Sequence, residues 1–191
     1  MIYFTADTHF LHNQILAYDS RPYLDMDAMI RDMIQRWNQT VRKTDIVYHV
    51  GDFAFGHPRR WAPIVKKLQG RITLIRGNHD LQNGATASRL TVENSALFND
   101  VGDIEQISLG GIPIVICHYP YTCLDGDDRI KDMRPKDNGK WLIHGHTHKR
   151  PVVTDRQINV GTMLWGYKPV SQKEICNLIQ KDVGPLVLDT Q

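Results

Sequence analysis

The chain has 191 residues, the length of one globular domain, and we expect residues 1–191 to fold as a single unit. Hydrophobic residues make up 41% of the chain and charged residues 23%, which is the balance of an ordinary globular protein. The formal net charge of +2 comes from nearly equal numbers of acidic and basic residues without a run of five like charges, so the charge pattern indicates neither a nucleic-acid tail nor a membrane patch.

The start of the chain lacks the pattern of a secretory signal. Met1 leads directly into a short apolar run, with neither a basic segment nor a long apolar core. No apolar stretch approaches the length that spans a bilayer. An odd number of cysteines without CxxC spacing, Cys117, Cys123 and Cys176, argues against a disulfide framework and a cysteine zinc site. We therefore expect a cytoplasmic protein with no membrane partner.

The first half of the chain predicts strands that alternate with helices. Residues 2–5 form an apolar run that predicts a buried strand, and residues 46–50 form a second. Between them, residues 26–37 predict one apolar face of a helix, with Asp25 in the N-cap position. The apolar positions of that helix are Met26, Met29, Ile30, Met33, Ile34 and Trp37.

A second helix and a third strand follow. Residues 61–68 repeat the helical spacing, and Gly70 stands where a helix commonly ends. Because proline is tolerated in the first turn of a helix, Pro63 predicts that this helix begins near Trp61. Residues 72–75 then predict another buried strand, which gives the order β-α-β-α-β.

The second half of the chain is richer in predicted hairpins. Residues 101–109 and 112–117 are the predicted arms of a hairpin, on either side of a Gly-Gly turn. Residues 152–154 and 158–160 flank a second two-residue turn. A Ser-x-x-Glu pattern at 171–174 is typical of a capping box and predicts the start of a last helix.

Five of the predicted strands, including one at residues 141–143, end in a group of polar residues. In α/β sheets, ligands bind beyond the carboxyl ends of the strands. We therefore expect the side chains at these ends to form one site. The groups begin at Asp7, Asp52, Asn78, His118 and His146.

These residue types suit a pair of metal ions. Asp7 and His9 are two positions apart, so at an extended strand end their side chains point to the same side, and His146 and His148 share that spacing. Imidazole together with carboxylate suits zinc, iron and manganese. Asp52 could bridge two cations, one through each oxygen. Paired metals of this kind, about 3.5–4 Å apart, clamp the attacking and leaving oxygens of a displacement at phosphorus.

In this order the motifs resemble those of the calcineurin-like metallophosphoesterases. The motifs are Asp7-x-His9, Gly51-Asp52, Gly77-Asn78-His79-Asp80, His118 and Gly145-His146-Thr147-His148. More narrowly, the chain is similar to the small single-domain bacterial and phage members, through the segments 3–10, 76–80, 159–161 and 165–170. The resemblance implies an α/β (α+β) fold, a four-layer αββα sandwich of two mixed sheets flanked by helices.

The resemblance also implies a role for each motif residue. One metal would be bound by Asp7, His9 and His148, the other by Asn78, His118 and His146, with Asp52 between them. His79 would protonate the leaving oxygen or stabilise the phosphoryl charge, and Asp80 would orient it.

From this we expect a hydrolase that acts on a phosphate monoester or phosphodiester of the nucleotide type, by attack of a hydroxide that bridges two metal ions. Two divalent cations would be the cofactors, manganese first, with iron, zinc or nickel as alternatives. The partner would be a small phosphorylated, nucleotide-like substrate. The sequence does not indicate the oligomeric state.

Four residues outside the metal motifs are candidates for substrate binding. His12, Asn13 and Arg21 follow the first motif and could meet the phosphate or its leaving group, although loop capping is an equal alternative for the first two. Arg76 precedes Asn78 and could hold a phosphoryl oxygen or be paired elsewhere.

The other histidines are expected to be structural. His49 and His144 each lie two positions before a motif residue, inside a predicted strand, where a buried supporting histidine is the simpler interpretation. His57 stands beside a proline and is expected in a loop.

Two other functions remain open at this point. A nuclease that acts on nucleic-acid ends would use the same metal site, but no basic stripe with interleaved aromatic residues is present. A non-catalytic binding protein of the same fold would lack some of the motif residues, and here every one is present.

Overall fold

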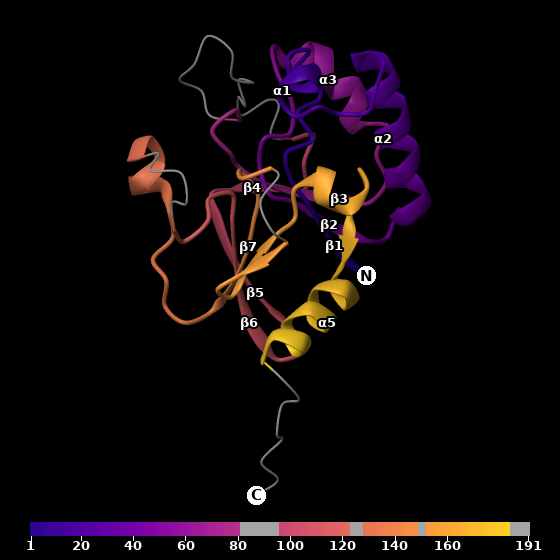
Figure 1. Ribbon diagram of the computed structural model, residues 1–191. Helices are drawn as coiled ribbons and strands as arrows, with labels where there is room; N and C mark the ends of the chain where they lie inside the picture. Colours follow the sequence, from indigo (N-terminus) through magenta and orange to yellow (C-terminus); the bar gives the residue numbers. More distant parts are fainter. Residues whose placement is uncertain (81–95, 123–127, 149–151, 184–191) are drawn as a thin grey trace, which may run out of the picture.

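The computed structural model describes residues 1–80, 96–122, 128–148 and 152–183 (Figure 1). Two five-stranded mixed sheets make up the centre of the molecule, with the strand orders β10-β1-β2-β3-β4 and β5-β6-β7-β9-β8. Four α-helices accompany them in these described ranges, so the predicted mixed α/β architecture with two mixed sheets is confirmed.

The first sheet contains the predicted β-α-β-α-β unit. Its strands are β1 (Ile2–Thr5), β2 (Ile46–His49), β3 (Arg71–Ile75), β4 (Asp100–Gly102) and β10 (Val170–Ser171). Strands β1 to β4 are parallel to one another, and only β10 is antiparallel, to β1. Because β1, β2 and β3 are parallel and in register, their carboxyl ends meet at one edge.

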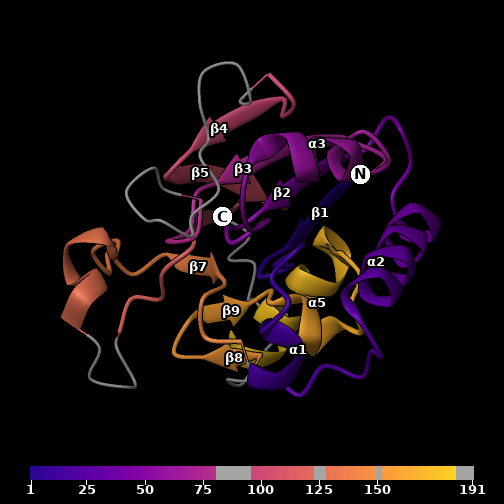
Figure 2. The same ribbon diagram turned by 90° about the horizontal axis from the view of Figure 1, so that it is seen from above.

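Helices α2 (Met26–Thr40) and α3 (Pro58–Val65) pack on the outer face of this sheet (Figure 2), and the short helix α1 (Ile15–Tyr18) lies above the upper ends of its strands in Figure 1. The predicted N-cap of α2 is confirmed, since the Asp25 side chain accepts a hydrogen bond of 2.7 Å from the backbone N–H of Ala28. The buried side chains of α2, Met26, Met29, Met33 and Trp37, are four of the six apolar positions predicted from the spacing.

The predicted start of α3 is wrong. The helix begins at Pro58, and His57 is its N-cap, with a 3.2 Å hydrogen bond from the Arg59 N–H to the His57 ring. Pro58 is favourable in the first position, where an N–H has no helical partner. Pro63 therefore lies inside the helix, which ends two residues later at Val65.

The second sheet consists of β5 (Ile104–Leu109), β6 (Ile112–Cys117), β7 (Trp141–His144), β8 (Val153–Thr154) and β9 (Gln157–Asn159). Both predicted hairpins are present as the antiparallel pairs β5–β6 and β8–β9. The single strand predicted over residues 101–109 is wrong, because β4 pairs with β3 in the first sheet and β5 pairs with β6 in the second. The chain changes sheets at Asp103.

The core between the sheets is made from both halves of the chain. Phe4, Val50 and Ile75 from the first sheet pack with Ile114 and Ile143 from the second, and all are almost completely buried. Helix α5 (Gln172–Val183) adds two buried isoleucines to this core and follows β10 (Figure 1).

Shorter elements complete the fold. The predicted capping box of α5 is confirmed, with Ser171 N–H donating to Glu174 at 3.0 Å and Glu174 N–H to the Ser171 hydroxyl at 3.3 Å. The 3₁₀ helix η1 (Asp128–Met133) lies beside β6, and η2 (Thr162–Trp165) precedes β10. Cys117 and Cys176 are free thiols, and Cys123 lies outside the described residues. Within the described ranges, no helix combines the length and apolar character needed to span a bilayer.

Candidate metal centre

The seven predicted metal ligands lie where the two sheets meet. Asp7, Asp52 and Asn78 follow β1, β2 and β3 of the first sheet. His118 follows β6 of the second sheet, and His146 with His148 follows β7. The sheets are joined beside these positions by a hydrogen bond of 3.0 Å from the Ala6 N–H to the Val160 carbonyl. The strand-end groups thus come together at one place, drawn from both halves of the chain.

One group of side chains consists of Asp7, His9, Asp52 and His148, whose candidate ligand atoms lie within 4.8 Å of one another. His9 Nε2 is 3.1 Å from His148 Nε2 and 3.6 Å from Asp52 Oδ2. His148 Nε2 is 3.7 Å from Asp7 Oδ1. Two imidazoles and two carboxylates therefore face a common point.

A second group consists of Asp52, His118 and His146. His118 Nε2 is 3.5 Å from Asp52 Oδ2, and His146 Nδ1 is 3.1 Å from Asn78 Oδ1. Asp52 belongs to both groups, so its carboxylate lies between two sets of ligand atoms.

The spacing of these atoms fits metal ions. In tetrahedral geometry, two ligand atoms that are each about 2.1 Å from one cation lie about 3.4 Å from each other. Asp52 Oδ2 lies at similar distances from two imidazole nitrogens, 3.5 Å from His118 Nε2 and 3.6 Å from His9 Nε2. Such separations are too long for good hydrogen bonds. Among the described residues, the buried atoms His118 Nε2 and His9 Nδ1 have no hydrogen-bond partner. A buried polar atom without a partner is costly, and a cation would satisfy His118 Nε2.

The electrostatics of the centre also favour cations. Burial alone would raise the pKa of the Asp52 carboxyl, but the imidazoles of His118, His9 and His79 outweigh burial and hold that pKa well below its usual value. Burial would likewise lower the pKa of His118, yet Asp52 and Asp7 raise it to about 9. The negative potential that stabilises a proton on His118 would equally attract a divalent ion.

Contacts outside the ligand groups orient two of the imidazoles. His118 Nδ1 donates a hydrogen bond of 2.8 Å to the Val50 carbonyl, which directs its Nε2 toward Asp52. His148 Nδ1 lies 2.9 and 3.0 Å from the two oxygens of Asp19, which directs its Nε2 toward Asp7. A carboxylate behind a ligating histidine fixes the ring and makes it a stronger ligand.

Asp19 is a residue that the sequence analysis missed. It follows the short helix α1 and does not stand at a strand end, so it carries none of the signals used to find the others. Its burial, with 6% of its surface exposed, marks it as an acid with a specific partner.

The position of Arg21 differs from the one expected. Its side chain is completely buried, and its guanidinium donates to the carbonyls of Asp7 at 2.8 Å and Thr8 at 2.9 Å. It also pairs with Asp19 at 3.2 Å. Arg21 therefore supports the backbone of the first motif from inside the protein, with its guanidinium engaged by protein groups, and not as the exposed phosphate contact that was expected.

Asp80 connects two loops of the centre through hydrogen bonds to their backbone. Its buried carboxylate accepts hydrogen bonds from the N–H groups of Asp52 at 2.7 Å, Phe53 at 3.1 Å and Gly77 at 2.9 Å. Burial, and then the charge of Asp52, raise the pKa of Asp80 to about 7. Asp80 thus ties the loops after β2 and β3 together, and its orientation of His79 stays a prediction.

His79 lies at the rim of the centre. About a third of its side chain is exposed, and its Nε2 is 3.9 Å from Asp52 Oδ2. Its backbone N–H donates to Asp52 Oδ1 at 2.9 Å, which fixes the loop against the shared carboxylate. His12 lies beside it, with ring centroids 6.0 Å apart, so the structure brings His12 to the site as expected.

Asn13 and Arg76 are not brought into either ligand group. Asn13 is exposed and lines a pocket of about 480 Å³ with residues that include Asp25 and Met26 at the start of α2. Arg76 forms a paired contact with Asp103, with nitrogen–oxygen distances of 2.8 and 2.6 Å. Of the two alternatives predicted for Arg76, a phosphoryl contact or an ion pair elsewhere, this contact is the ion pair.

The backbone of the motifs is strained at the predicted ligands and closely packed at two glycines. Five of the seven predicted ligands have left-handed backbone conformations, with positive φ angles at Asp7, His9, Asp52, His146 and His148. Residues other than glycine rarely adopt this backbone conformation, and those that do are concentrated at functional sites. A Cβ on Gly51 would lie 2.3 Å from His118 Nδ1, and one on Gly77 would lie 2.3 Å from Asp52 Oδ1. Glycine at these two positions therefore leaves room for the side chains of His118 and Asp52, which pack directly on the backbone.

The remaining histidines are placed as supporting or loop residues. The Thr8 hydroxyl donates to the Phe53 carbonyl at 2.7 Å, so it accepts from His49 Nε2 at 2.9 Å. His144 is buried, with its Nδ1 2.8 Å from the Gly145 carbonyl. Burial lowers the pKa of His49 to about 3 and that of His144 to about 4, so both are neutral. Neither belongs to a ligand group.

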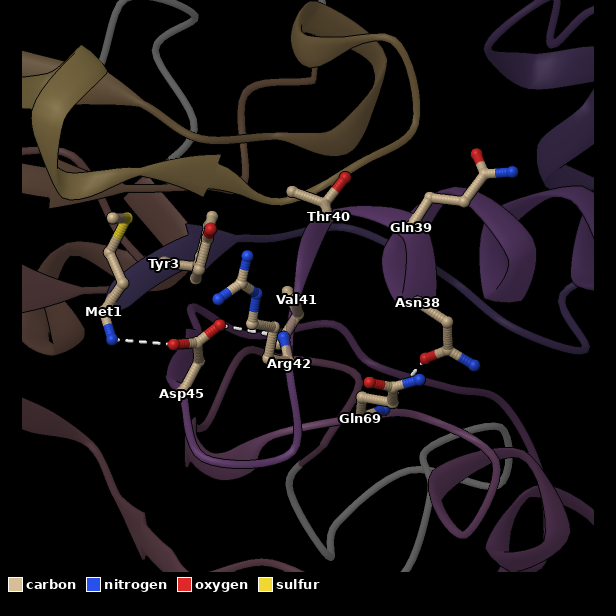
Figure 3. A pocket seen from close by; sticks show the side chains of 9 residues that line it. All are labelled: Met1, Tyr3, Asn38, Gln39, Thr40, Val41, Arg42, Asp45 and Gln69. Atoms are coloured by element: carbon tan, nitrogen blue, oxygen red, sulfur yellow. Dashed lines mark hydrogen bonds and ion pairs between the residues drawn. The ribbon is translucent and has the colours of Figure 1, made fainter.

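A separate pocket of about 560 Å³ lies at the amino-terminal end of the first sheet (Figure 3). Its polar groups are largely engaged with one another. The N-terminal ammonium of Met1 pairs with Asp45 at 2.7 Å, and Asn38 accepts from the Gln69 N–H at 2.9 Å. Since ligand sites of α/β sheets lie at the other end of the strands, this pocket is distinct from the metal centre.

Comparisons with known proteins agree with this architecture. A family model described as the calcineurin-like phosphoesterase superfamily domain matches residues 1–173. An uncharacterized protein of Methanocaldococcus jannaschii is 31% identical over 193 residues, covering 94% of this chain and 92% of that protein. The Gene 66 protein of Mycobacterium phage L5 is 30% identical over 210 residues, covering 93% of each.

A solved structure has the same arrangement of elements. The protein of unknown function AQ665 from Aquifex aeolicus superposes with a TM-score of 0.73 at 26% sequence identity. The superposition covers 93% of this chain and 98% of the other.

Proposed function

The chain belongs to the calcineurin-like phosphoesterase superfamily, and on that premise we propose that it hydrolyses a phosphate monoester or phosphodiester at the metal centre. The observation that carries the proposal is the position of Asp52. One buried carboxylate lies within 3.6 Å of imidazoles from both ligand groups, as a residue shared by two cations would. The substrate is proposed to be a small phosphorylated molecule.

The donor set fits two divalent cations, one held by Asp7, His9 and His148 and one by Asn78, His118 and His146, with Asp52 common to both. Such ions lower the pKa of water and offset the charge of the phosphoryl group as it is transferred. Nitrogen and oxygen donors together suit manganese, which we propose as the native metal, with iron, zinc and nickel as alternatives.

The protein's own residues would supply orientation and a proton. Val50 and Asp19 fix the rings of His118 and His148, so the ligand atoms are preorganised. His79, at the exposed rim, is placed to donate a proton from Nε2 to the leaving oxygen. In the proposed reaction, water provides a new oxygen on phosphorus, the bond from phosphorus to the leaving oxygen breaks, and that oxygen departs as a hydroxyl group.

The proposal is tested with two generic substrates, 4-nitrophenyl phosphate and bis(4-nitrophenyl) phosphate. The manganese-loaded protein should hydrolyse at least one of them, and Asp52→Asn should remove that activity while circular dichroism shows an intact fold. An Asp52→Asn variant as active as the wild type would contradict the proposal. Metal binding without hydrolysis of any ester would favour the non-catalytic alternative, and faster hydrolysis of oligonucleotides than of mononucleotides would favour the nuclease.

A further inference from the structure

A row of aromatic rings runs from the metal centre to the molecular surface. His79 at the rim is in ring contact with Phe55, at a centroid distance of 5.0 Å, and with His12 at 6.0 Å. His12 packs on Phe55 at 4.1 Å and reaches Tyr18 at 6.2 Å. We call His12, Tyr18 and Phe55 the ring cluster.

The ring cluster is joined to the ligands themselves. His9, a member of the first ligand group, lies 5.6 Å from the ring of His12 and 5.2 Å from that of His79. At the other end of the row, 66% of Tyr18 is exposed. The cluster therefore presents aromatic surface continuously from a metal ligand to solvent.

Packing of the core does not account for these rings. Phe10 and Phe53 lie two residues before His12 and Phe55, respectively. Their side chains are 0% and 2% exposed and pack on each other inside the core. Phe55, two positions after Phe53, is partly exposed and contacts the rings beside the centre instead. Its position is fixed by a hydrogen bond of 2.8 Å from its N–H to the Phe10 carbonyl.

The position of the cluster relative to His79 indicates which part of a substrate it would meet. If His79 gives its proton to the leaving oxygen, the group attached to that oxygen extends from His79 over Phe55 and Tyr18. Aromatic side chains next to a phosphate site provide stacking surfaces for bases. We propose that the leaving group carries a planar aromatic ring of the size of a nucleobase, and that Tyr18 and Phe55 stack on it. This inference rests on the proposed hydrolysis.

A diester with two chemically similar leaving groups tests the orientation. Adenosine 5′-(methyl phosphate) can lose either adenosine or methanol, and both are alcohols of similar acidity. The inference predicts adenosine and methyl phosphate as products of the manganese-loaded enzyme. Adenosine 5′-monophosphate and methanol would overturn it.

A pair of esters that differ only in the base tests the contact, for whichever ester class is hydrolysed. Adenosine 5′-monophosphate is compared with ribose 5-phosphate, and adenosine 5′-(methyl phosphate) with ribose 5-(methyl phosphate). Since stacking on an aromatic side chain is strong enough to change binding by at least about fivefold, kcat/KM should favour the base by at least that factor. Equal values for the wild type would overturn the inference.

Variants separate stacking from support of His79. Tyr18→Leu and Phe55→Leu should reduce the preference for the base toward one, whereas Tyr18→Phe keeps the ring and the preference. Leu24→Ala, which shortens an apolar side chain that is 94% exposed and outside the ring cluster, should leave both rates unchanged. An equal loss for both esters in the leucine variants would show that the rings only support His79 and would overturn the inference.

A failure of the proposed function is recognised separately, because then no ester is hydrolysed with any metal. Binding still decides the inference in that case. Calorimetry with the metal-loaded protein should show tighter binding of adenosine 5′-monophosphate than of ribose 5-phosphate, and a loss of that difference in Tyr18→Leu. Equal affinities would overturn the inference.

Discussion

Asp19 and His148 are 129 positions apart in the chain and are joined by a contact of 2.9 Å between a carboxylate oxygen and Nδ1. This contact leaves Nε2 of His148 directed toward Asp7. Asp19 is itself held by Arg21, whose guanidinium also supports the backbone of Asp7. Asp19 and Arg21 thus support one predicted ligand from each sheet, His148 and Asp7.

The substitution Asp19→Asn should weaken metal binding about 10- to 100-fold, because it removes the negative charge behind His148. The measurement is the dissociation constant for manganese by calorimetry. Asp27→Asn, which changes an exposed aspartate on α2, is the matched control and should bind as the wild type does. An unchanged affinity in Asp19→Asn would show that the contact does not tune the ligand.

The substitution Arg21→Met should destabilise the fold by about 3–5 kcal/mol, because it leaves the buried Asp19 with His148 alone as its ionic partner and removes the donor to two carbonyls. Arg21→Lys, which keeps the charge but loses the planar fork, should lie between that variant and the wild type. Denaturant unfolding gives the free energies. A variant of normal stability with a raised KM would instead restore Arg21 as a substrate contact.

The substitution Gly77→Ala should reduce metal affinity and activity together. The added Cβ would lie 2.3 Å from Asp52 Oδ1, so the shared carboxylate or the loop after β3 must move. Gly102→Ala is the control, since the nearest atom to its Cβ is 4.0 Å away. Manganese titration with activity as a second readout compares the two, and similar behaviour of both variants would contradict the close-packing argument.

The substitution His79→Gln should lower kcat about 10²- to 10⁴-fold, since glutamine cannot donate a proton to the leaving oxygen. Metal affinity should stay near that of the wild type, because His79 belongs to neither ligand group. Steady-state kinetics with metal calorimetry tests both expectations. Loss of the metal in this variant would place His79 among the ligands.

Removal of metal should lower the melting temperature. A ligand at about 100 times its Kd stabilises the native state by about 2.7 kcal/mol, which for a chain of this size corresponds to roughly 5–10 °C. Thermal unfolding with manganese and with EDTA measures the difference. Asp52→Asn should show a smaller one, and the same shift in both proteins would mean that the stabilising ion binds elsewhere.

The strand-end groups could be predicted because their signal is local. A short β-branched run followed by glycine and a polar residue predicts both the end of a strand and the place of its next side chain. Asp52 and Asn78 were found in this way, and the structure puts them beside His118 and His146. Whether these residues bind metal remains a prediction.

Features that depend on distant partners could not be predicted in the same way. The role of Asp19 depends on its contact with His148, which follows a strand of the other sheet. The sequence around Arg21 does not show that its side chain donates to the buried carbonyl of Asp7. The run at 101–109 reads as one strand because nothing local marks Asp103 as the point where the chain passes between sheets. The start of α3 is ambiguous in the sequence because Pro58 and Pro63 are both compatible with the first turn of a helix.

The shared carboxylate between two sheets also has a consequence for biosynthesis. Asp7, His9 and Asp52 leave the ribosome early, but His146 and His148 follow almost a hundred residues later. The nascent first half therefore carries four of the seven predicted ligands, Asp7, His9, Asp52 and Asn78, before the three histidines of the second half are made. We expect such an incomplete set to bind a cation weakly. The proposed metallation is therefore expected to be a late event, coupled to the docking of the second sheet, and the metal available in the compartment at that moment would decide which ion the protein binds.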